Sequence, residues 1–273
     1  MIQSSALPIS KRPGTVAGRV TTNRGPNAGL VCQATLRYTR QNRAMSSTVS
    51  PQFWGLLRRR TCWLPTLRGW LLLLLLFGPL LVFGFRNADA FLAVNDPVPN
   101  GVLVVEGWSP DYALETARSD AQRNPDHKLY VIGGPLEQGA PLSEYKTYAE
   151  LGAATLRQMG MSNDAVQAVP APYVRKDRTY AAAVALRDWF RQHGGVPQAV
   201  NLISMGAHAR RSRLMFEEAF GSGRRVGIIN VADRDYDSRQ WWKSSQGVRS
   251  VLDELIAYGY ARFLFFPSAE QRP

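Results

Sequence analysis

The sequence predicts an α/β domain, a three-layer sandwich around a mainly parallel sheet of about five strands, preceded by one transmembrane helix. Three observations predict this class. Short and almost wholly apolar runs recur between residues 102 and 230, and such runs are typical of strands buried on both faces. Segments with apolar residues at helical spacing alternate with these runs, as in parallel sheets whose strands are joined by helices. An uncharged apolar stretch over residues 69–85 precedes the whole series.

The individual elements follow from these patterns. Apolar runs predict five strands, at residues 102–105, 129–132, 165–169, 199–203 and 225–230. Helical spacing predicts five helices. Three are expected at residues 110–123, 143–159 and 178–192, a fourth follows the fourth strand and includes residues 214–220, and the last lies around residues 248–256.

The expected helix ends rest on capping residues. Pro110 is tolerated in a first helical turn and opens the first helix. Ser143 is expected to cap the second helix, and Gly160 to stop it. Asp177 is the expected N-cap of the third helix, which ends at His193.

Residues 69–86 are predicted to be a transmembrane anchor or a signal sequence. The uncharged part is seventeen residues long, the lower limit for a membrane-spanning helix. Basic residues precede it, which predicts a cytoplasmic N-terminus, a domain outside the cytoplasm and a lipid bilayer as partner of residues 69–86. Ala88-Asp89-Ala90 has the small-x-small pattern that signal peptidase reads, so secretion after cleavage near Ala90 is the alternative.

The remaining segments are interpreted from composition. Residues 1–68 form a basic segment that we expect to be cytoplasmic and disordered, with Met45 as an alternative start. Residues 87–101 are the expected linker, 102–265 the α/β domain and 266–273 a tail.

Most of the excess positive charge lies before the apolar stretch. The formal net charge is +12 over 273 residues. Residues 1–68 contain eleven Lys and Arg and no Asp or Glu, so residues 69–273 carry 22 basic and 21 acidic side chains, a net of about +1. The domain should therefore lack the basic face that nucleic-acid binding requires, and we expect no nucleic acid among its partners.

The domain also lacks the residues of several common sites. Cys32 and Cys62 both precede the apolar stretch, which leaves no disulfide, thiolate nucleophile or cysteine-ligated metal after it. His127, His193 and His208 are far apart in the sequence, and we predict no metal site. No dinucleotide or phosphate-loop fingerprint is present, so the cofactor, if there is one, is unknown.

Ligands bind parallel sheets outside the carboxyl ends of the strands, so residues that follow the strands are the candidates for a site. Gly133-Gly134 follows the second strand, where two glycines would let the backbone approach a ligand, although a tight turn is the simpler alternative. Thr179, early in the third helix, would face the same crevice as His208.

The strongest candidate is the stretch SMGAHARRSRLMF, residues 204–216, where a strand gives way to a helix. His208 and Arg211 are three residues apart and share a helix face. The N–H groups of the helix start and the guanidinium favour an anion, with Arg210 assisting, and His208 could transfer a proton. The alternative is a solvated basic helix start. Ser204 is not favoured as a nucleophile, because the first glycine of a nucleophile elbow is absent.

Trp241-Trp242 precedes the last helix. These tryptophans could form a stacking surface or a membrane-facing edge, but core or lid packing is the favoured interpretation.

Several fragments together resemble the SanA/YdcF/ElyC-like family, catalogued as domain of unknown function 218. The matching fragments are Gly133-Gly134 with Ser143-Glu144, Asp177-Arg178-Thr179, the string HARRSR at 208–213, Trp241-Trp242, and Glu254-Leu255-Ile256-Ala257-Tyr258. The resemblance covers roughly residues 100–265. It implies a Rossmann-like three-layer sandwich, in many members behind a single N-terminal anchor, and a link to bacterial envelope integrity and to cell-wall precursor or lipid-carrier metabolism.

The resemblance also implies which residues form the site, namely Gly133, Gly134, Glu144, Thr179, His208 and Arg211. One departure is Glu106-Gly107-Trp108, where many relatives have a glycine-rich turn, and it adds a carboxylate to the crevice.

The sequence therefore leads to two functional hypotheses. The first is an envelope protein in the bacterial inner (plasma) membrane, with a periplasmic domain that binds an anionic, phosphorylated or carbohydrate-linked ligand such as a lipid-linked cell-wall precursor. Its candidate catalytic residues are His208, Glu106 and Glu144, and its candidate ligand-binding residues are Gly133, Gly134, Thr179, Arg210 and Arg211. The second is a non-catalytic scaffold or binding module that uses the Trp241-Trp242 face. Whether the protein is an enzyme stays open.

Overall fold

The computed structural model describes residues 57–59, 63–123 and 128–268. The expected disorder of residues 1–56, the alternative start at Met45, and the positions of Cys32, Cys62 and His127 lie outside this range. The chain divides into two compact units, 1–72 and 73–273.

The first unit contains a short hairpin where the sequence predicted disorder. The strands β1 (Leu57–Arg59) and β2 (Trp63–Pro65) pair in antiparallel orientation, and three residues of each face one another.

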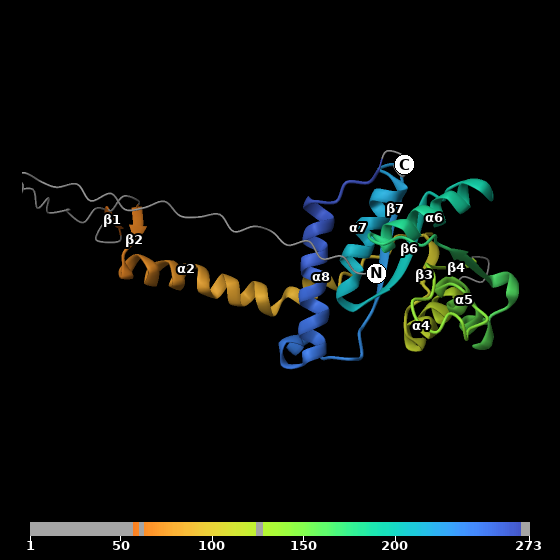
Figure 1. The fold of residues 1–273 in the computed structure, drawn as a ribbon, viewed down its shortest axis with the longest axis horizontal. Helices are drawn as coiled ribbons and strands as arrows, with labels where there is room; N and C mark the ends of the chain where they lie inside the picture. Colours follow the sequence, from red (N-terminus) through yellow and green to blue (C-terminus); the bar gives the residue numbers. More distant parts are fainter. Residues whose placement is uncertain (1–56, 60–62, 124–127, 269–273) are drawn as a thin grey trace, which may run out of the picture. The chain divides into compact units, whose positions relative to one another are not determined.

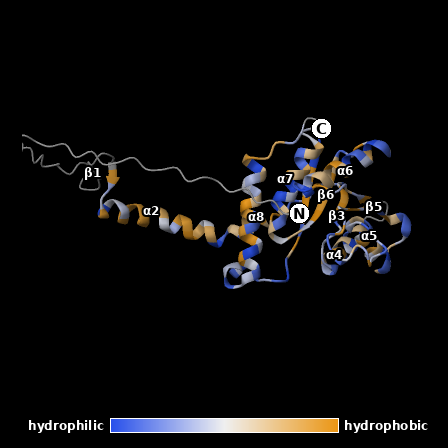
Figure 2. Ribbon diagram, in the orientation of Figure 1, coloured by the Kyte–Doolittle hydropathy of each residue, from blue (hydrophilic) through white to orange (hydrophobic). Residues whose placement is uncertain are grey.

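The helix α2 (Leu67–Arg86) is 20 residues long and mainly hydrophobic (Figure 2). Its large apolar side chains are exposed, Leu74 to 71% and Leu75 to 75%. By length and composition α2 can cross a membrane, although a signal sequence near the N-terminus passes the same test.

The second unit is built on a five-stranded parallel sheet with strand order β5-β4-β3-β6-β7 (Figure 1). The strands are, in chain order, β3 (Val102–Glu106), β4 (Leu129–Gly133), β5 (Val166–Pro170), β6 (Ala199–Met205) and β7 (Arg225–Val231). All five predicted strands are confirmed. The first strand, β3, is central: the chain adds β4 and β5 on one side of it, then crosses over to add β6 and β7 on the other.

Helices pack on both faces of this sheet. Alternate strand residues point to opposite faces, so Val104 joins one apolar cluster, whereas Leu103 and Val105 join another. The first cluster includes residues of α6 (Arg178–Gln192) and α7 (Ala209–Phe220), and the second includes residues of α4 (Asp111–Gln122) and α5 (Tyr148–Gln158). The α/β class is confirmed.

One predicted cap is wrong, and the other is confirmed in position but makes no side-chain capping bond. The helix after β4 begins at Tyr148, because Thr147 and Glu150 form a capping box there: the Thr147 hydroxyl accepts from Glu150 N at 3.2 Å, and the Glu150 carboxylate accepts from Thr147 N at 2.9 Å. Ser143 lies on the preceding loop, where its hydroxyl accepts only from Tyr145 N among its described contacts. Asp177 does occupy the N-cap position of α6, but its backbone is left-handed (φ 56°) and its side chain makes no capping bond.

The segment predicted as a linker is partly built into the domain. It contains the short helix α3 (Ala88–Leu92), whose Ala88, Asp89 and Leu92 are buried. Asp96 then pairs with the edge strand β7, its N–H donating to the Ile228 carbonyl at 2.8 Å and its carbonyl accepting in return at 3.0 Å. This pairing covers the exposed edge of the sheet.

The C-terminal helices complete the domain. The 3-10 segment η3 (Ser238–Lys243) leads into α8 (Ser245–Phe263). Trp241 is fully buried in a third apolar cluster with α3 residues, and its ring centroid lies 4.6 Å from that of Phe85. Core packing, the favoured interpretation for Trp241, is confirmed. Trp242 is half-buried. The full burial of Trp241 removes the two-tryptophan docking face of the scaffold hypothesis.

Candidate functional site

A cluster of charged side chains lies where the strand order reverses, between the carboxyl ends of β3 and β6. Glu106 is the last residue of β3. Beyond β6, the 3-10 turn η2 (Gly206–His208) brings His208 to the start of α7. Open parallel sheets bind their ligands at such a reversal, because the two neighbouring connections leave in opposite directions and open a crevice.

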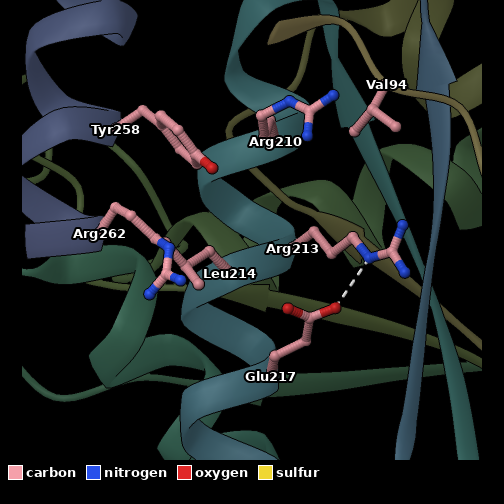
Figure 3. A pocket seen from close by; sticks show the side chains of 7 residues that line it. All are labelled: Val94, Arg210, Arg213, Leu214, Glu217, Tyr258 and Arg262. Atoms are coloured by element: carbon pink, nitrogen blue, oxygen red, sulfur yellow. Dashed lines mark hydrogen bonds and ion pairs between the residues drawn. The ribbon is translucent and has the colours of Figure 1, made fainter. Parts of the chain in front are cut away.

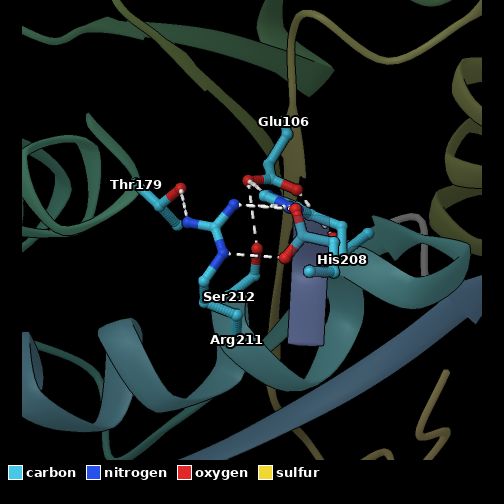
Figure 4. A network of polar contacts seen from close by, with 7 residues as sticks. Glu106, Thr179, His208, Arg211 and Ser212 are labelled. Atoms are coloured by element: carbon cyan, nitrogen blue, oxygen red, sulfur yellow. Dashed lines mark hydrogen bonds and ion pairs between the residues drawn. The ribbon is translucent and has the colours of Figure 1, made fainter. Parts of the chain in front are cut away.

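Glu106 is the buried centre of the cluster (Figure 4). One carboxylate oxygen accepts from the Ser204 hydroxyl at 2.7 Å. The other lies 3.3 Å from His208 Nε2 and 3.4 Å from the Ser212 hydroxyl. Ser204 lies in β6, His208 on the turn η2 and Ser212 in α7, so the end of β6 and the start of α7 together fix the carboxylate at the end of β3.

His208 bridges two carboxylates. Its Nε2 faces Glu106, and its Nδ1 lies 2.7 Å from Glu254 Oε1 on α8. An ionised carboxylate only accepts hydrogen bonds, so both ring nitrogens must donate, and the ring is an imidazolium. The half-exposed Trp108 meets the imidazole edge-on, with ring centroids 5.2 Å apart.

Arg211 forms a forked ion pair with Glu254. Its Nε and Nη2 donate to the two carboxylate oxygens at 2.8 and 2.9 Å. Nη2 also lies 2.9 Å from His208 Nδ1, and we interpret this as the approach of two cations to one shared Glu254 oxygen, since both nitrogens donate. The remaining nitrogen, Nη1, has a long contact of 3.5 Å to the Thr179 hydroxyl as its one hydrogen bond to a described residue.

The environment shifts the pKa values of the three central groups. Burial alone would lower the pKa of His208, but the Glu106 charge and hydrogen bonds to Glu106 and Glu254 outweigh it and raise the pKa to about 9. Burial would raise the pKa of Glu106, yet the His208 charge and the bonds from His208 and Ser204 lower it. For Glu254 the bonds from Arg211 and His208 likewise outweigh burial and lower the pKa to about 2.

The cluster is therefore neutral as a whole at pH 7, since two carboxylates balance one imidazolium and one guanidinium. An anionic ligand would have to share Arg211 with Glu254, and it would approach from the Nη1 side beside Thr179. Both protons of the imidazolium are donated to carboxylates, so a bound group could take a proton from His208 only after it replaces one of these acceptors.

The structure brings together four of the residues predicted from the sequence. Glu106, Thr179, His208 and Arg211 lie in one network (Figure 4). Glu144 does not belong to this network: it is exposed on the loop before α5, and none of its contacts among the described residues reaches the cluster. Glu144 was assigned to the site from the family resemblance, together with an expected helix start at 143, which lies five residues too early.

The two glycines after β4 have different roles. A Cβ at Gly133 would lie 2.7 Å from Tyr148 Cβ and 2.8 Å from Ala149 N, so Gly133 is needed for the close packing of α5 on the strand end. A Cβ at Gly134 would meet nothing nearer than 4.0 Å. The prediction that both glycines make room for a ligand is therefore wrong for Gly133, whose space is filled by the protein itself.

Arg210 points away from the cluster. Its Nε donates to the Phe91 carbonyl, and its guanidinium carbon lies 4.1 Å from the centre of the Phe91 ring. Neighbours on a helix are about 100° apart, so Arg210 faces α3, whereas Arg211 faces the crevice. The expectation that Arg210 assists Arg211 is wrong.

Sequence reasoning missed three contributors to the site. Glu254 was noted only as part of a family fragment, and Ser204 was considered as a nucleophile and not as a donor to Glu106. Ser212 was noted only within the string HARRSR. A signal for Glu254 exists, because it lies three residues after Val251 and four before Tyr258, and a carboxylate on the apolar side of a helix needs a partner. Within the described ranges, no three His, Cys, Asp or Glu side chains are grouped as metal ligands would be.

Comparison with known proteins adds no name to this site, since no family model, no curated protein and no solved structure matches the chain.

Proposed function

We propose that the chain is a membrane-anchored protein of the bacterial envelope whose α/β domain binds an anionic ligand in the crevice between β3 and β6. The ligand class is a phosphorylated or carbohydrate-linked molecule, such as a lipid-linked cell-wall precursor. One observation carries the proposal: Glu106, His208, Arg211 and Glu254 form a buried ionic network at the reversal of strand order. The first strand of the sheet, β3, lies in its centre, and this strand order also supports the Rossmann-like fold that the family resemblance implies.

The geometry suggests a role for each group. Arg211 Nη1 and the Thr179 hydroxyl are the two donors that the network leaves least occupied, and both can donate to a phosphate or carboxylate oxygen. Trp108 offers a half-exposed aromatic ring beside His208, which suits the apolar face of a sugar ring. Binding is therefore the primary activity in this proposal.

A chemical step would use His208 as a proton donor. The raised pKa keeps the ring protonated at neutral pH, so His208 would act as a general acid toward a leaving oxygen and not as a base. The leaving oxygen would have to replace Glu254 as the acceptor at Nδ1, while Glu106 would stabilise the imidazolium through Nε2. Transfer or hydrolysis on a phosphate-linked or sugar-linked substrate is the reaction class that needs such a donor.

Two observations support retention of the membrane helix. The Ala88-Asp89-Ala90 pattern lies in α3, where Ala88 and Asp89 are buried. Asp89 accepts a 2.6 Å hydrogen bond from the Tyr236 hydroxyl, and removal of Asp89 would leave that buried group without its partner. A signal-peptidase cut after Ala90 would remove these contacts, so the anchor is the better account of α2.

Substitution of the two central cations tests the proposal. His208→Gln and Arg211→Gln should each abolish complementation of the envelope defect in cells that lack the protein, while His193→Gln, an exposed histidine at the end of α6, should complement fully. Membrane abundance of each variant, measured by immunoblot, separates loss of function from loss of folding. Full complementation by both crevice variants at normal abundance would refute the proposal.

A further inference from the structure

The helix α7 carries unpaired positive charge on the side that faces away from the crevice. On that side a cavity of about 400 Å³ opens between α7, α8 and the segment after α3 (Figure 3). Arg210, Arg213 and Arg262 line it, together with Glu217 and Tyr258. We call this cavity the α7–α8 groove.

The three arginines of the groove differ in how far they are neutralised. Arg213 is fully paired, because it donates to Asp96 at 2.7 Å and to Glu217 at 2.9 Å. Arg262 is exposed and makes no hydrogen bond or ion pair with any residue in the described ranges. Arg210 uses only its Nε, and neither of its Nη atoms has a partner among the described residues.

The position of Arg210 is fixed although its charge is not neutralised. The Phe91 ring lies under the guanidinium, the Phe91 carbonyl accepts from Nε, and Tyr258 meets the same ring edge-on at 5.6 Å between centroids. The Nη pair is therefore held in place without a counter-charge. A fixed guanidinium fork with two open donors matches the oxygens of a phosphate.

The groove has an apolar part as well. Val94 and Leu214 line it beside the arginines. A ligand that fills it would combine an anionic oxygen group with a short aliphatic portion, as a glycerophosphate headgroup does.

The groove also lies close to the end of the candidate membrane helix. Phe91 follows Arg86, the last residue of α2, by five positions, so their Cα atoms are at most about 18 Å apart. The polar region of a bilayer leaflet is about 5–8 Å thick, which puts lipid phosphates within reach of a groove that close to the end of a membrane span. This step depends on the membrane anchor of the proposed function.

We propose that the α7–α8 groove binds the phosphate of a membrane phospholipid at the open Nη atoms of Arg210, with Arg262 as a second cation in contact with the headgroup. This site is separate from the crevice, because Arg211, which faces the crevice, does not line the groove. Such binding would hold the domain against the bilayer with the crevice positioned for a lipid-linked ligand.

Native mass spectrometry of the full chain released from detergent micelles tests the proposal. Phosphatidylglycerol should remain bound, and diacylglycerol with the same acyl chains, which lacks the phosphate, should not. Arg262→Gln should weaken phosphatidylglycerol binding about tenfold, as expected for loss of one charge-assisted contact. Within the described ranges Arg262 has no hydrogen bond or ion pair whose loss would affect folding. Arg249→Gln, the same change at an exposed site on α8, should leave binding unchanged.

Three results would overturn the proposal. Equal lipid affinity of the Arg262→Gln and Arg249→Gln variants would show that the groove is not the site. Equal retention of diacylglycerol would show that the phosphate is not recognised. Displacement of the lipid by an equal concentration of inorganic phosphate would show a site for free phosphate instead.

The failure of this proposal can be distinguished from that of the proposed function. Arg211→Gln should impair the crevice and leave phosphatidylglycerol binding intact, whereas Arg262→Gln should do the reverse. If α2 is not a membrane anchor, the chain should stay soluble without detergent. The lipid proposal would then be refuted because its premise, the membrane anchor, is wrong.

Discussion

The ionisation of His208 makes a direct prediction about stability and pH. The pKa of His208 is raised from its ordinary value of 6.5 to about 9, so the folded state binds this proton more tightly than the unfolded chain does. The stabilisation is fully present below pH 6.5 and is lost as the pH rises through about 9. One pKa unit corresponds to about 1.4 kcal/mol, so the loss across this window is on the order of 3 kcal/mol.

The assay is urea denaturation of the full chain in detergent micelles, followed by tryptophan fluorescence at several values between pH 6 and 10. The variant His208→Gln removes the titrating group, so the difference between the two curves isolates its contribution from that of all other groups. Wild type should lose about 3 kcal/mol relative to the variant between pH 6.5 and 9.5. Parallel curves, or a His208 ring that titrates near 6.5 in an NMR experiment, would refute the interpretation of His208 as an imidazolium between two carboxylates.

Three further predictions concern the packing of the site, each measured as the free energy of unfolding at pH 7. Glu254→Gln should lower the free energy of unfolding by about 3 kcal/mol, because it leaves two partly buried cations without their shared carboxylate. The control Asp253→Asn, at the neighbouring exposed residue, should change it by less than about 0.5 kcal/mol. Equal effects of the two substitutions would contradict the ion-pair geometry. Gly133→Ala should lower the free energy of unfolding by about 1–3 kcal/mol through its clash with the start of α5, and Gly134→Ala should be nearly neutral; the opposite order would contradict the packing role of Gly133. Ser204→Ala should lower the free energy of unfolding by about 1–3 kcal/mol, since it removes the hydroxyl that donates to the buried Glu106 carboxylate at 2.7 Å. A change below about 0.5 kcal/mol would mean that this hydrogen bond does not stabilise the carboxylate.

The sequence was most informative where one local pattern decides the structure. Strands buried on both faces leave wholly apolar runs, and all five were found at their predicted places to within two residues. The start of α5 was also encoded locally, because Thr147 and Glu150 have the spacing of a capping box, but Ser143 competed as a cap candidate. The choice between two such caps depends on the close packing of Gly133 against the helix, which is a tertiary contact.

The site was only partly predictable for a related reason. His208 and Arg211 share a helix face by spacing alone, and the strand-end rule places Glu106 near them. The partner that neutralises both cations, Glu254, comes from a helix more than forty residues later, and only the folded chain shows that α8 lies against α7. Arg210 was assigned to the crevice because the position of α3, which draws it to the other side, has no signal in the sequence.

Ligand binding by the crevice is the central claim, and an equilibrium binding measurement tests it most directly. The full chain in phosphatidylcholine nanodiscs would be titrated with a polyprenyl diphosphate-linked sugar. We predict saturable binding that Arg211→Gln weakens at least about tenfold, through loss of the donor beside Thr179, and that the exposed control Arg249→Gln leaves unchanged. Equal affinity of the Arg211→Gln variant and the wild type would contradict the assignment of this crevice as the functional site.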